Sequence, residues 1–362
     1  MNRRDFLDPR HLAGSIAPLA GALSCDEPSL EETPVHLRFG RRAMATQFEV
    51  ILPLATPDAH LCALEALDEI DRLEDQLTVF RDTSEVSRLN GRAAHYPVPV
   101  EPRLFELLCL AKRLYAETKG AFDIAVGALI KTWGFYRRKG RVPTEAERAA
   151  VRERIGMQYV LLDPERQTVC FQRQGLEINL GSIGKGYALD RAAALLKGRP
   201  GIRNLLVHGG HSSVLAVGDE APGKSGWTIG ILDPEHPGCR RAVIHLHDRG
   251  MATSAITHQH FRHAGRKLGH LLDPRTAWPA EGVLSATVTA PTAAEADALA
   301  TAFFILGEDG ARVYCEGRPH IGAVLITERQ PGRLQIVGEA KRELDVAGSG
   351  LLGGGPVGRG GS

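Results

Sequence analysis

The sequence LSATVTAPTAAEADALATAFFIL, residues 284–306, contains the two signals that decide the fold class. Its first seven residues are apolar or small and rich in threonine, which is typical of a buried strand. Thr292 then stands three residues before Glu295, the spacing of a helix capping box. We therefore expect a helix that begins at Thr292 and continues to residue 306, packed against the strand before it.

Short strands and longer helices continue in both directions from this segment, separated by turns rich in glycine, proline and aspartate. Further helices are predicted at 59–78, 102–118 and 186–197, and further strands at 46–52, 158–163, 204–207, 213–217, 227–232, 242–247, 321–326 and 334–338. An arginine-rich stretch at 137–154 is expected to form a loop and a short surface helix. The pattern predicts an α+β fold, with a mixed or antiparallel sheet and helices packed against it.

The composition is that of an ordinary globular protein, with 362 residues, a formal net charge of +1 and 43% hydrophobic residues. The sequence has no excess of basic residues that would indicate a nucleic-acid partner. The six cysteines include no C-x-x-C pair, which argues against a zinc knuckle or a dithiol redox centre. The predicted organisation is an export signal and linker at 1–34, one domain at 35–345 and a disordered glycine-rich tail at 346–362.

The N-terminal segment has the features of an export signal. Asn2-Arg3-Arg4-Asp5-Phe6-Leu7 resembles a twin-arginine signal, and the apolar stretch after it is too short for a transmembrane helix. Cys25 follows Ala22-Leu23-Ser24, a loose match to a lipoprotein cleavage site that would anchor the protein to the membrane. A disordered N-terminus is the alternative. We predict an exported protein, periplasmic or held on the outer side of the inner membrane.

A glycine-rich loop precedes one of the predicted helices. Its sequence is Asn179-Leu180-Gly181-Ser182-Ile183-Gly184-Lys185-Gly186-Tyr187. Backbone N–H groups at a helix N-terminus favour anions, and Lys185 adds a positive charge, so the loop suits a phosphate or pyrophosphate. It is not a P-loop, because Asn179 and Gly186 stand where that motif needs a glycine and a hydroxyl residue. A turn required only for packing is the alternative.

Asp297 and Thr301 lie four residues apart on the helix that begins at Thr292 and therefore share a face. Their neighbours are small or apolar, so the carboxylate is predicted to be buried and to need a partner. A carboxylate and a hydroxyl are oxygen ligands of the kind that Mg²⁺ takes, with substrate phosphates completing its shell. The alternative is an exposed aspartate and a threonine bonded back to its own helix.

Aromatic and hydroxyl side chains in two other segments also suit a ligand site. Phe122 and Trp133 would line a pocket for a flat ring, and Asp123 would bond the edge of that ring. Core packing is the alternative for both aromatic residues. Thr253 and Ser254 offer hydroxyls to phosphate or carbonyl oxygens, or else are ordinary strand residues.

Histidines are concentrated in one segment, at His258, His260, His263 and His270. Their spacing does not favour a zinc or copper site, which needs convergent ligands. His270 precedes Leu271-Leu272-Asp273-Pro274 at a predicted turn, where a histidine would titrate near neutrality and suit the role of general base. A turn histidine without a catalytic role is the alternative.

Taken in order, these segments resemble the FAD:protein FMN transferase (ApbE-like) family. The resemblance runs from about residue 40 to residue 310. The segments that carry it are Met44-Ala45-Thr46, Ser84–Asn90, Gly120–Asp123 with Trp133-Gly134-Phe135, Gly181–Tyr187 with Asp190, Gly209-Gly210, Thr253-Ser254, His270–Thr276 and Asp297–Thr301. It implies an ApbE-like architecture and the transfer of FMN from FAD to a Thr or Ser hydroxyl of a partner flavoprotein, with release of AMP.

The resemblance also implies residue roles. Mg²⁺ or another divalent cation would be held by Asp297, Thr301 and the backbone carbonyl of Ser182. The residues expected to contact FAD are Met44, Phe80, Ala121, Phe122, Asp123, Asn179, Lys185, Thr253, Ser254 and Leu271. The catalytic residues would be Lys185 and a base, either His270 or Asp273.

Four positions depart from the family pattern. Asn179 and His211 stand where aspartate is usual, and Ala255 and Ala277 stand where glycine is common. Asn179 can still form hydrogen bonds but cannot carry charge. Two alternatives to FMN transfer stay open: a magnesium-dependent FAD pyrophosphatase that yields FMN and AMP, and a flavin-binding protein without chemistry.

Overall fold

A computed structural model of the chain describes residues 35–137, 140–210, 212–236, 238–256, 260–263, 266–340 and 344–345. The predicted export segment at 1–34, the tail at 346–362, His211 and His258 lie outside these residues, and what was expected of them stays a prediction. Within the described residues, no helix is long and apolar enough to cross a membrane.

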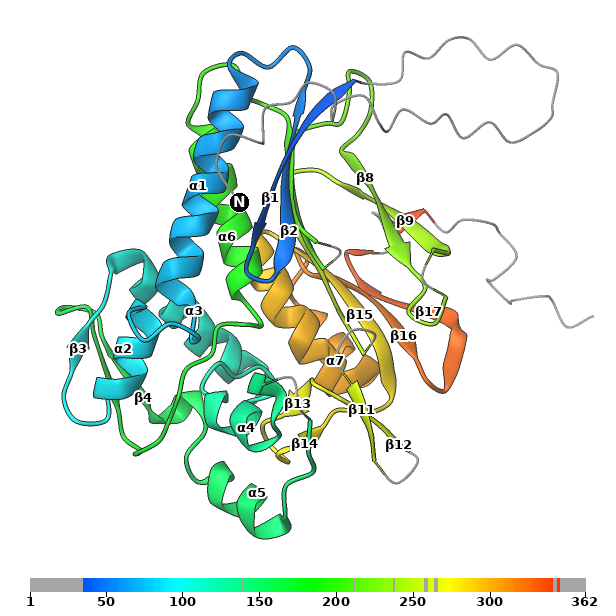
Figure 1. Cartoon of the computed structure of the whole chain (residues 1–362). Helices are drawn as coiled ribbons and strands as arrows, with labels where there is room; N and C mark the ends of the chain where they lie inside the picture. Colours follow the sequence, from blue (N-terminus) through cyan, green and yellow to red (C-terminus); the bar gives the residue numbers. More distant parts are fainter. Residues whose placement is uncertain are drawn as a thin grey trace, which may run out of the picture. The chain divides into compact units, whose positions relative to one another are not determined.

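The main sheet has eight strands (Figure 1), which are β1 (His36–Ala43), β2 (Thr46–Pro53), β6 (Leu205–Gly209), β7 (Ser213–Val217), β10 (Arg249–Ala255), β15 (Val283–Ala290), β16 (Gly322–Thr327) and β17 (Gln330–Gly338). Their order across the sheet follows their order along the chain. Every neighbouring pair is antiparallel. The α+β prediction is confirmed, and the main sheet is antiparallel rather than mixed.

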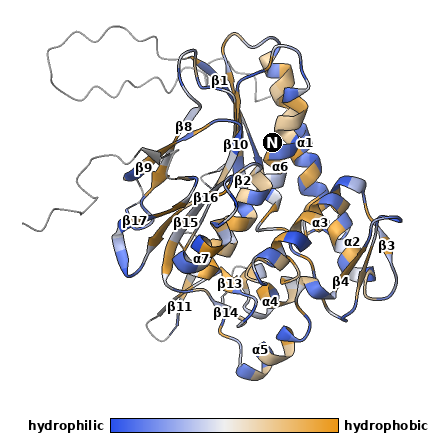
Figure 2. Ribbon diagram, turned by 180° about the vertical axis from the view of Figure 1, so that it is seen from behind, coloured by the Kyte–Doolittle hydropathy of each residue, from blue (hydrophilic) through white to orange (hydrophobic). Residues whose placement is uncertain are grey.

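Three helices cover one face of this sheet, namely α1 (Ala59–Leu77), α6 (Gly184–Lys197) and α7 (Ala293–Cys315). Phe48, Val50 and Leu52 of β2 point toward them and are fully buried in the largest core cluster. Ile51, between them in sequence, points to the opposite face, as the two-residue period of a strand requires. Figure 2 shows the alternation of apolar and polar residues along these elements.

The opposite face is covered by a small sheet of β8 (Trp227–Leu232), β9 (Arg240–Leu246) and β18 (Leu344–Asp345). Trp227 and Ile244 of this small sheet pack against Ile51 and Leu206 of the main sheet. The remaining elements are α2 (Glu85–Arg92), β3 (Val98–Pro99), α3 (Pro102–Glu117), α4 (Gly127–Thr132), η2 (Phe135–Arg137), α5 (Glu145–Arg152), η3 (Met157–Tyr159), β4 (Val160–Asp163), β5 (Thr168–Phe171), β11 (His260–His263), β12 (Arg266–Gly269), β13 (Leu272–Asp273) and β14 (Trp278–Pro279).

Helix α7 begins as the capping box predicts. Thr292 is its N-cap, and the Thr292 hydroxyl accepts the backbone N–H of Glu295 at 3.1 Å. The predicted end at residue 306 is confirmed, because Gly307 has the non-helical angles φ 70° and ψ −171°. Glycine adopts a positive φ without strain, and a second helical segment continues beyond this kink to Cys315.

Candidate functional site

The predicted metal carboxylate lies where α6 and α7 meet. Asp297 is 5% exposed, so its predicted burial is confirmed. Its Oδ2 accepts the backbone N–H of Gly186 at 3.1 Å, and its Oδ1 lies 3.4 Å from both Nζ of Lys185 and Oγ of Ser213. The structure therefore brings the glycine-rich loop and the Asp297 carboxylate together.

Gly186 permits this close approach of the two helices. A Cβ atom on Gly186 would lie 2.1 Å from the carbonyl oxygen of Ala293, a distance that no side chain can occupy. Gly184, at the start of the same helix, has only Leu180 near its Cβ position, at 3.8 Å. One glycine of the loop is thus required for packing, in addition to any role in binding a phosphate.

Thr301 faces strand β10, one helical turn beyond Asp297. Its Oγ1 lies 3.3 Å from Oγ of Ser254 and 3.5 Å from the carbonyl oxygen of Asp297. Thr253 points to the other face of the sheet, where its hydroxyl lies 2.8 Å from that of Thr287. The structure brings Ser254 beside the predicted metal pair and separates Thr253 from it.

The oxygen donors around Asp297 fit a divalent cation such as Mg²⁺. Both contacts of Asp297 Oδ1 are 3.4 Å long, so its lone pairs are weakly engaged. The Gly186 N–H, a first-turn donor of α6 that has no acceptor within its own helix, donates to Asp297. No three His, Cys, Asp or Glu side chains of the described residues gather as a metal cluster. A carboxylate, hydroxyls and a carbonyl are the few protein ligands that Mg²⁺ takes.

The segment from Ala121 to Asp123 is buried beside the glycine-rich loop. Asn179 joins the two, because its backbone N–H donates to the carbonyl of Ile124 at 2.7 Å. The Asp123 carboxylate accepts the backbone N–H of Ala125 at 2.7 Å, and burial raises the pKa of Asp123 to about 7. The ring of Phe122 is fully buried in the core, which is the packing alternative for this residue.

Met44 and Ala45 form a two-residue turn between β1 and β2, where Ala43 pairs with Thr46. Both turn residues are left-handed, with φ 46° and φ 60°. Residues other than glycine rarely adopt this backbone conformation, which costs on the order of 1 kcal/mol or more for each residue. Two positive φ angles in succession are what a two-residue hairpin turn of type I′ requires, and the contact of Met44 with FAD stays a prediction.

Phe80 forms an exposed aromatic platform. Its side chain is 68% exposed and stacks on Tyr136 with ring centroids 4.7 Å apart. The Tyr136 hydroxyl donates to the carbonyl of Val79 at 2.9 Å, and Nζ of Lys131 lies 5.2 Å from the centre of the Tyr136 ring. An exposed ring that is held in this way suits stacking against a flat ligand.

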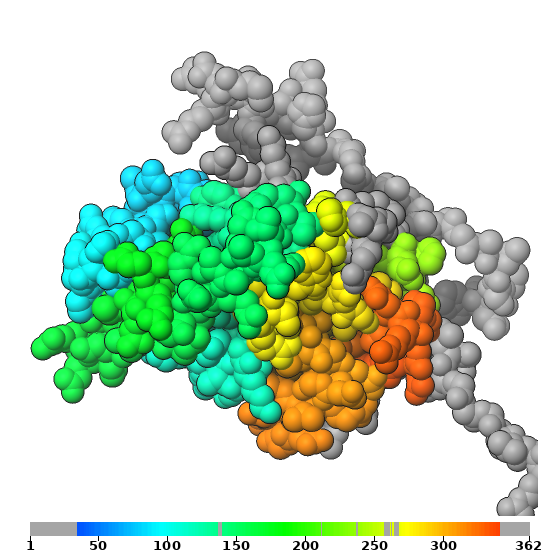
Figure 3. Space-filling model, turned by 90° about the horizontal axis from the view of Figure 1, so that it is seen from below, coloured from blue at the N-terminus to red at the C-terminus, as the bar shows by residue number. Residues whose placement is uncertain are grey.

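The predicted catalytic turn lies at β13 and β14, which pack against α4. Both oxygens of Asp273 are engaged by Arg275, at 2.9 Å from Nε and 2.8 Å from NH2. His270 and Leu271 are half-buried just before this strand pair. In Figure 3 the yellow surface around residues 270–280 lies between the green surface of α4 and α5 and the orange surface of α7.

Three residues of the site were not singled out as site residues from the sequence. Ser213 is fully buried against Asp297, and Asn90 bonds both the N–H and the carbonyl of Ile178, at 2.8 and 2.9 Å, before the glycine-rich loop. Asp190 accepts backbone N–H groups at the start of α7. Only Asp190 had a usable signal, because it stands four residues after Gly186 and shares its helix face.

Comparisons with known proteins agree with this geometry. The family model described as "ApbE family" matches residues 44–325. The FAD:protein FMN transferase of Klebsiella pneumoniae (strain 342) is 31% identical over 83% of this chain and 87% of its own length. That of Haemophilus influenzae is 33% identical over 74% of this chain and 79% of its own.

Solved structures of the same family have this fold. The ApbE protein of Thermotoga maritima superimposes with a TM-score of 0.77 and 28% identity, covering 85% of this chain and 99% of that one. The flavin transferase ApbE of Vibrio cholerae superimposes with a TM-score of 0.74 and 25% identity. The match covers 86% of this chain and 100% of that one. The predicted ApbE-like architecture is therefore confirmed.

Proposed function

The chain belongs to the ApbE family, and we propose that it transfers FMN from FAD to a threonine or serine hydroxyl of a partner flavoprotein, releasing AMP. Relatives that match most of this chain are named FAD:protein FMN transferase. The observation that carries the proposal is the buried Asp297 carboxylate, which meets Lys185 and Gly186 of an anion-binding loop.

We propose that Asp297, Thr301 and the backbone carbonyl of Ser182 bind a divalent cation, which is Mg²⁺ or another ion of the same charge. When bound, the ion would polarise the FAD pyrophosphate as a Lewis acid. Asp297 supplies the charge, and its orientation is fixed by the Gly186 N–H. The oxygen-only ligand set supports a hard cation over zinc or copper.

The reaction exchanges one phosphorus–oxygen bond for another. The acceptor hydroxyl oxygen attacks the phosphorus on the FMN side of the pyrophosphate, forming a phosphoester. The bond from this phosphorus to the bridging oxygen breaks, and AMP leaves with the bonding electron pair. The hydroxyl is a poor nucleophile until its proton is accepted by a base. Lys185 is suited to neutralising the phosphate charge, since its Nζ lies at the loop.

We propose His270 as that base in preference to Asp273. A carboxylate with both oxygens held by Arg275 is a weak proton acceptor, because protonation would break a bidentate ion pair. His270 has an imidazole whose ordinary pKa suits proton transfer near neutrality.

FAD recognition is assigned to the residues around the loop. Phe80 would stack on a ring of FAD, whereas the Asp123 carboxyl is buried and accepts the backbone N–H of Ala125. Met44 and Leu271 add apolar contact, and Asn179 fixes the loop by accepting the N–H of Gly181 at 2.9 Å. These roles rest on the exposure of Phe80 and on the links between the segments.

A direct test combines the purified protein with FAD, Mg²⁺ and a flavoprotein domain that has an exposed acceptor threonine. Transfer predicts that the mass of the acceptor rises by one FMN while one AMP is released for each FMN attached. An acceptor with that threonine replaced by alanine is the control. FMN release without acceptor labelling would indicate the pyrophosphatase instead, and unchanged FAD would exclude both activities.

We also propose that the protein acts outside the cytoplasm. The support is the twin-arginine-like segment at residues 2–7, with Cys25 as a candidate lipidation site. Cell fractionation tests this proposal: an Arg3→Lys/Arg4→Lys variant should stay in the cytoplasm, and Cys25→Ala should leave the membrane fraction. Export that ignores the arginine pair would contradict it.

A further inference from the structure

Helices α6 and α7 cap each other's N-termini. The Asp297 carboxylate, on α7, accepts the N–H of Gly186 in the first turn of α6. The Asp190 carboxylate, on α6, accepts the N–H groups of Ala293 and Ala294 in the first turn of α7, at 2.8 and 2.9 Å. From Gly186 to Asp190 the chain of α6 advances four residues, while their partners on α7 go back four residues, from Asp297 to Ala293. The helices are therefore antiparallel and joined by two carboxylate contacts.

The two helix starts depend on this exchange to different degrees. The N-cap of α6 is Ile183, which makes no side-chain cap hydrogen bond, so Asp297 provides the side-chain capping of that end. The N-cap of α7 is Thr292, whose hydroxyl takes the N–H of Glu295. Asp190 accepts the N–H groups of the two residues before Glu295, which are Ala293 and Ala294. Asp190 therefore differs from Thr292 in linking α7 to another helix.

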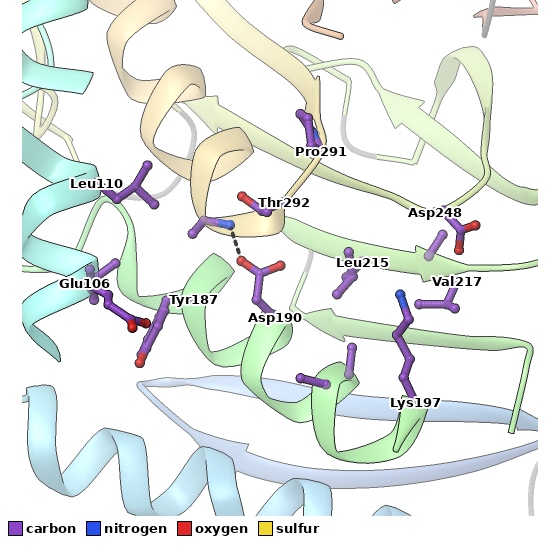
Figure 4. Close-up of a pocket in the computed structure, with 15 residues that line it drawn as sticks. Glu106, Leu110, Tyr187, Asp190, Lys197, Leu215, Val217, Asp248, Pro291 and Thr292 are labelled. Atoms are coloured by element: carbon purple, nitrogen blue, oxygen red, sulfur yellow. Dashed lines mark hydrogen bonds between the residues drawn. The ribbon is translucent and has the colours of Figure 1, made fainter. Parts of the chain in front are cut away.

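Side-chain packing is incomplete around Asp190. The residue lines a pocket of about 390 Å³, together with Tyr187, Lys197, Leu215 and Thr292. Figure 4 shows the Asp190 carboxylate pointing from α6 toward the first turn of α7, with Thr292 beside it. The first turn of α7 also packs closely on α6, since a Cβ atom on Gly186 would lie 2.1 Å from the Ala293 carbonyl oxygen, and the Asp190 hydrogen bonds give this contact its direction.

We propose that Asp190 is a positioning residue for the metal-binding carboxylate, an inference that rests on the proposed function. Asp190 fixes where α7 starts relative to α6. That start sets the position of Asp297 one turn later, relative to Lys185 and the glycine-rich loop. Outer partners of metal ligands act in this way, by orienting a ligand that they do not themselves replace.

The experiment compares Asp190→Asn with Thr292→Ala in Mn²⁺ binding, measured by electron paramagnetic resonance without FAD. Asparagine keeps one acceptor oxygen but turns an NH₂ group toward the second N–H, so one hydrogen bond is lost. We expect the Mn²⁺ Kd of Asp190→Asn to rise about 10-fold or more. Thr292→Ala also removes a cap from α7 but leaves the link to α6, so its Kd should change less than about twofold.

Thermal unfolding of both variants, followed by circular dichroism, shows that they fold and that each loses a helix cap. Steady-state kinetics add a second readout: Asp190→Asn should lower kcat at subsaturating Mg²⁺ and leave the KM for FAD unchanged. An equal loss of Mn²⁺ affinity in both variants would reduce Asp190 to an ordinary cap and overturn the inference, as would no loss in Asp190→Asn. Failure of the wild-type protein to bind Mn²⁺ in an Asp297-dependent way would overturn the metal site as well.

Discussion

Nζ of Lys185 lies 3.4 Å from Oδ1 of Asp297, so a lysine of the glycine-rich loop neutralises the carboxylate that is proposed to bind the metal. The side chains are 23% and 7% exposed, so the pair is largely shielded from solvent. A cation that binds Asp297 would compete with this lysine for the carboxylate. The pyrophosphate of FAD would in turn attract the displaced ammonium group.

Replacing Lys185 by methionine should therefore raise the affinity for the metal while slowing transfer. Without FAD, the Mn²⁺ Kd should fall several-fold, because no ammonium group competes for Asp297. FMN transfer should fall at least about 10-fold, because a charge near the phosphate is lost. Lys112→Met is the control, since Nζ of Lys112 donates to the carbonyl of Val160 at 2.5 Å and has no part in the proposed FAD or metal site. Weaker Mn²⁺ binding in Lys185→Met would contradict the competition.

Asp297→Ala should abolish turnover. The substitution removes the only charged side chain in the proposed ligand set and leaves Lys185 without its partner. We expect AMP release, measured by chromatography, to fall at least about 100-fold. Asp309→Ala is the matched control, because Asp309 is exposed on the same helix. Full activity of Asp297→Ala would remove the proposed metal site.

The two candidate bases should respond differently to substitution. His270→Ala is expected to slow transfer by about 100- to 10,000-fold, with little change in FAD affinity. Asp273→Asn should cost less than about tenfold, since its carboxylate serves to hold Arg275 and the turn. The transfer rate and the Kd for FAD, measured for both variants, separate the roles. A larger loss in Asp273→Asn would reverse the assignment.

Local signals predicted the elements well because they act within a few residues. The helix start at Thr292 and the buried strand at residues 284–290 depend on neighbours, and both predictions are confirmed. Contacts between distant segments could not be derived in this way. Asp297 is 112 residues from Lys185, and nothing in either segment alone indicates that they meet.

The arrangement of the sheet was also needed to decide toward which face each strand residue points. Thr253 and Ser254 are adjacent in sequence and were expected to act together, yet a strand turns them to opposite faces. The sequence allows Phe122 to be either a pocket residue or a core residue. Its complete burial in the structure shows that it packs in the core. The helical segment after Gly307 was not predicted, because its place in the core depends on tertiary contacts that the local pattern does not contain.

Burial of Asp123 should make stability depend on pH. Its pKa is raised to about 7 in the folded protein, against 3.8 ordinarily, so between these values the folded state holds the proton that the unfolded state has lost. The free energy of unfolding must then fall as pH rises from about 4 to 7, by roughly 4 kcal/mol at most from this group. Asp123→Asn should lack that part of the slope in urea titrations, whereas the exposed control Asp309→Asn should retain it. Parallel curves for Asp123→Asn and wild type would contradict the buried acid.

Gly186→Ala should separate packing from catalysis at the contact of the two helices. Its Cβ would lie 2.1 Å from the Ala293 carbonyl oxygen, so α7 must move away from α6. We expect a loss of about 1–3 kcal/mol in the free energy of unfolding, as for other overpacked sites. Gly184→Ala is the matched control, since its Cβ would meet only Leu180 at 3.8 Å and alanine favours a helix by up to about 1 kcal/mol. Because displacement of α7 also carries Asp297 away from the Gly186 N–H, Gly186→Ala should weaken Mn²⁺ binding as well, whereas Gly184→Ala should bind Mn²⁺ like the wild type.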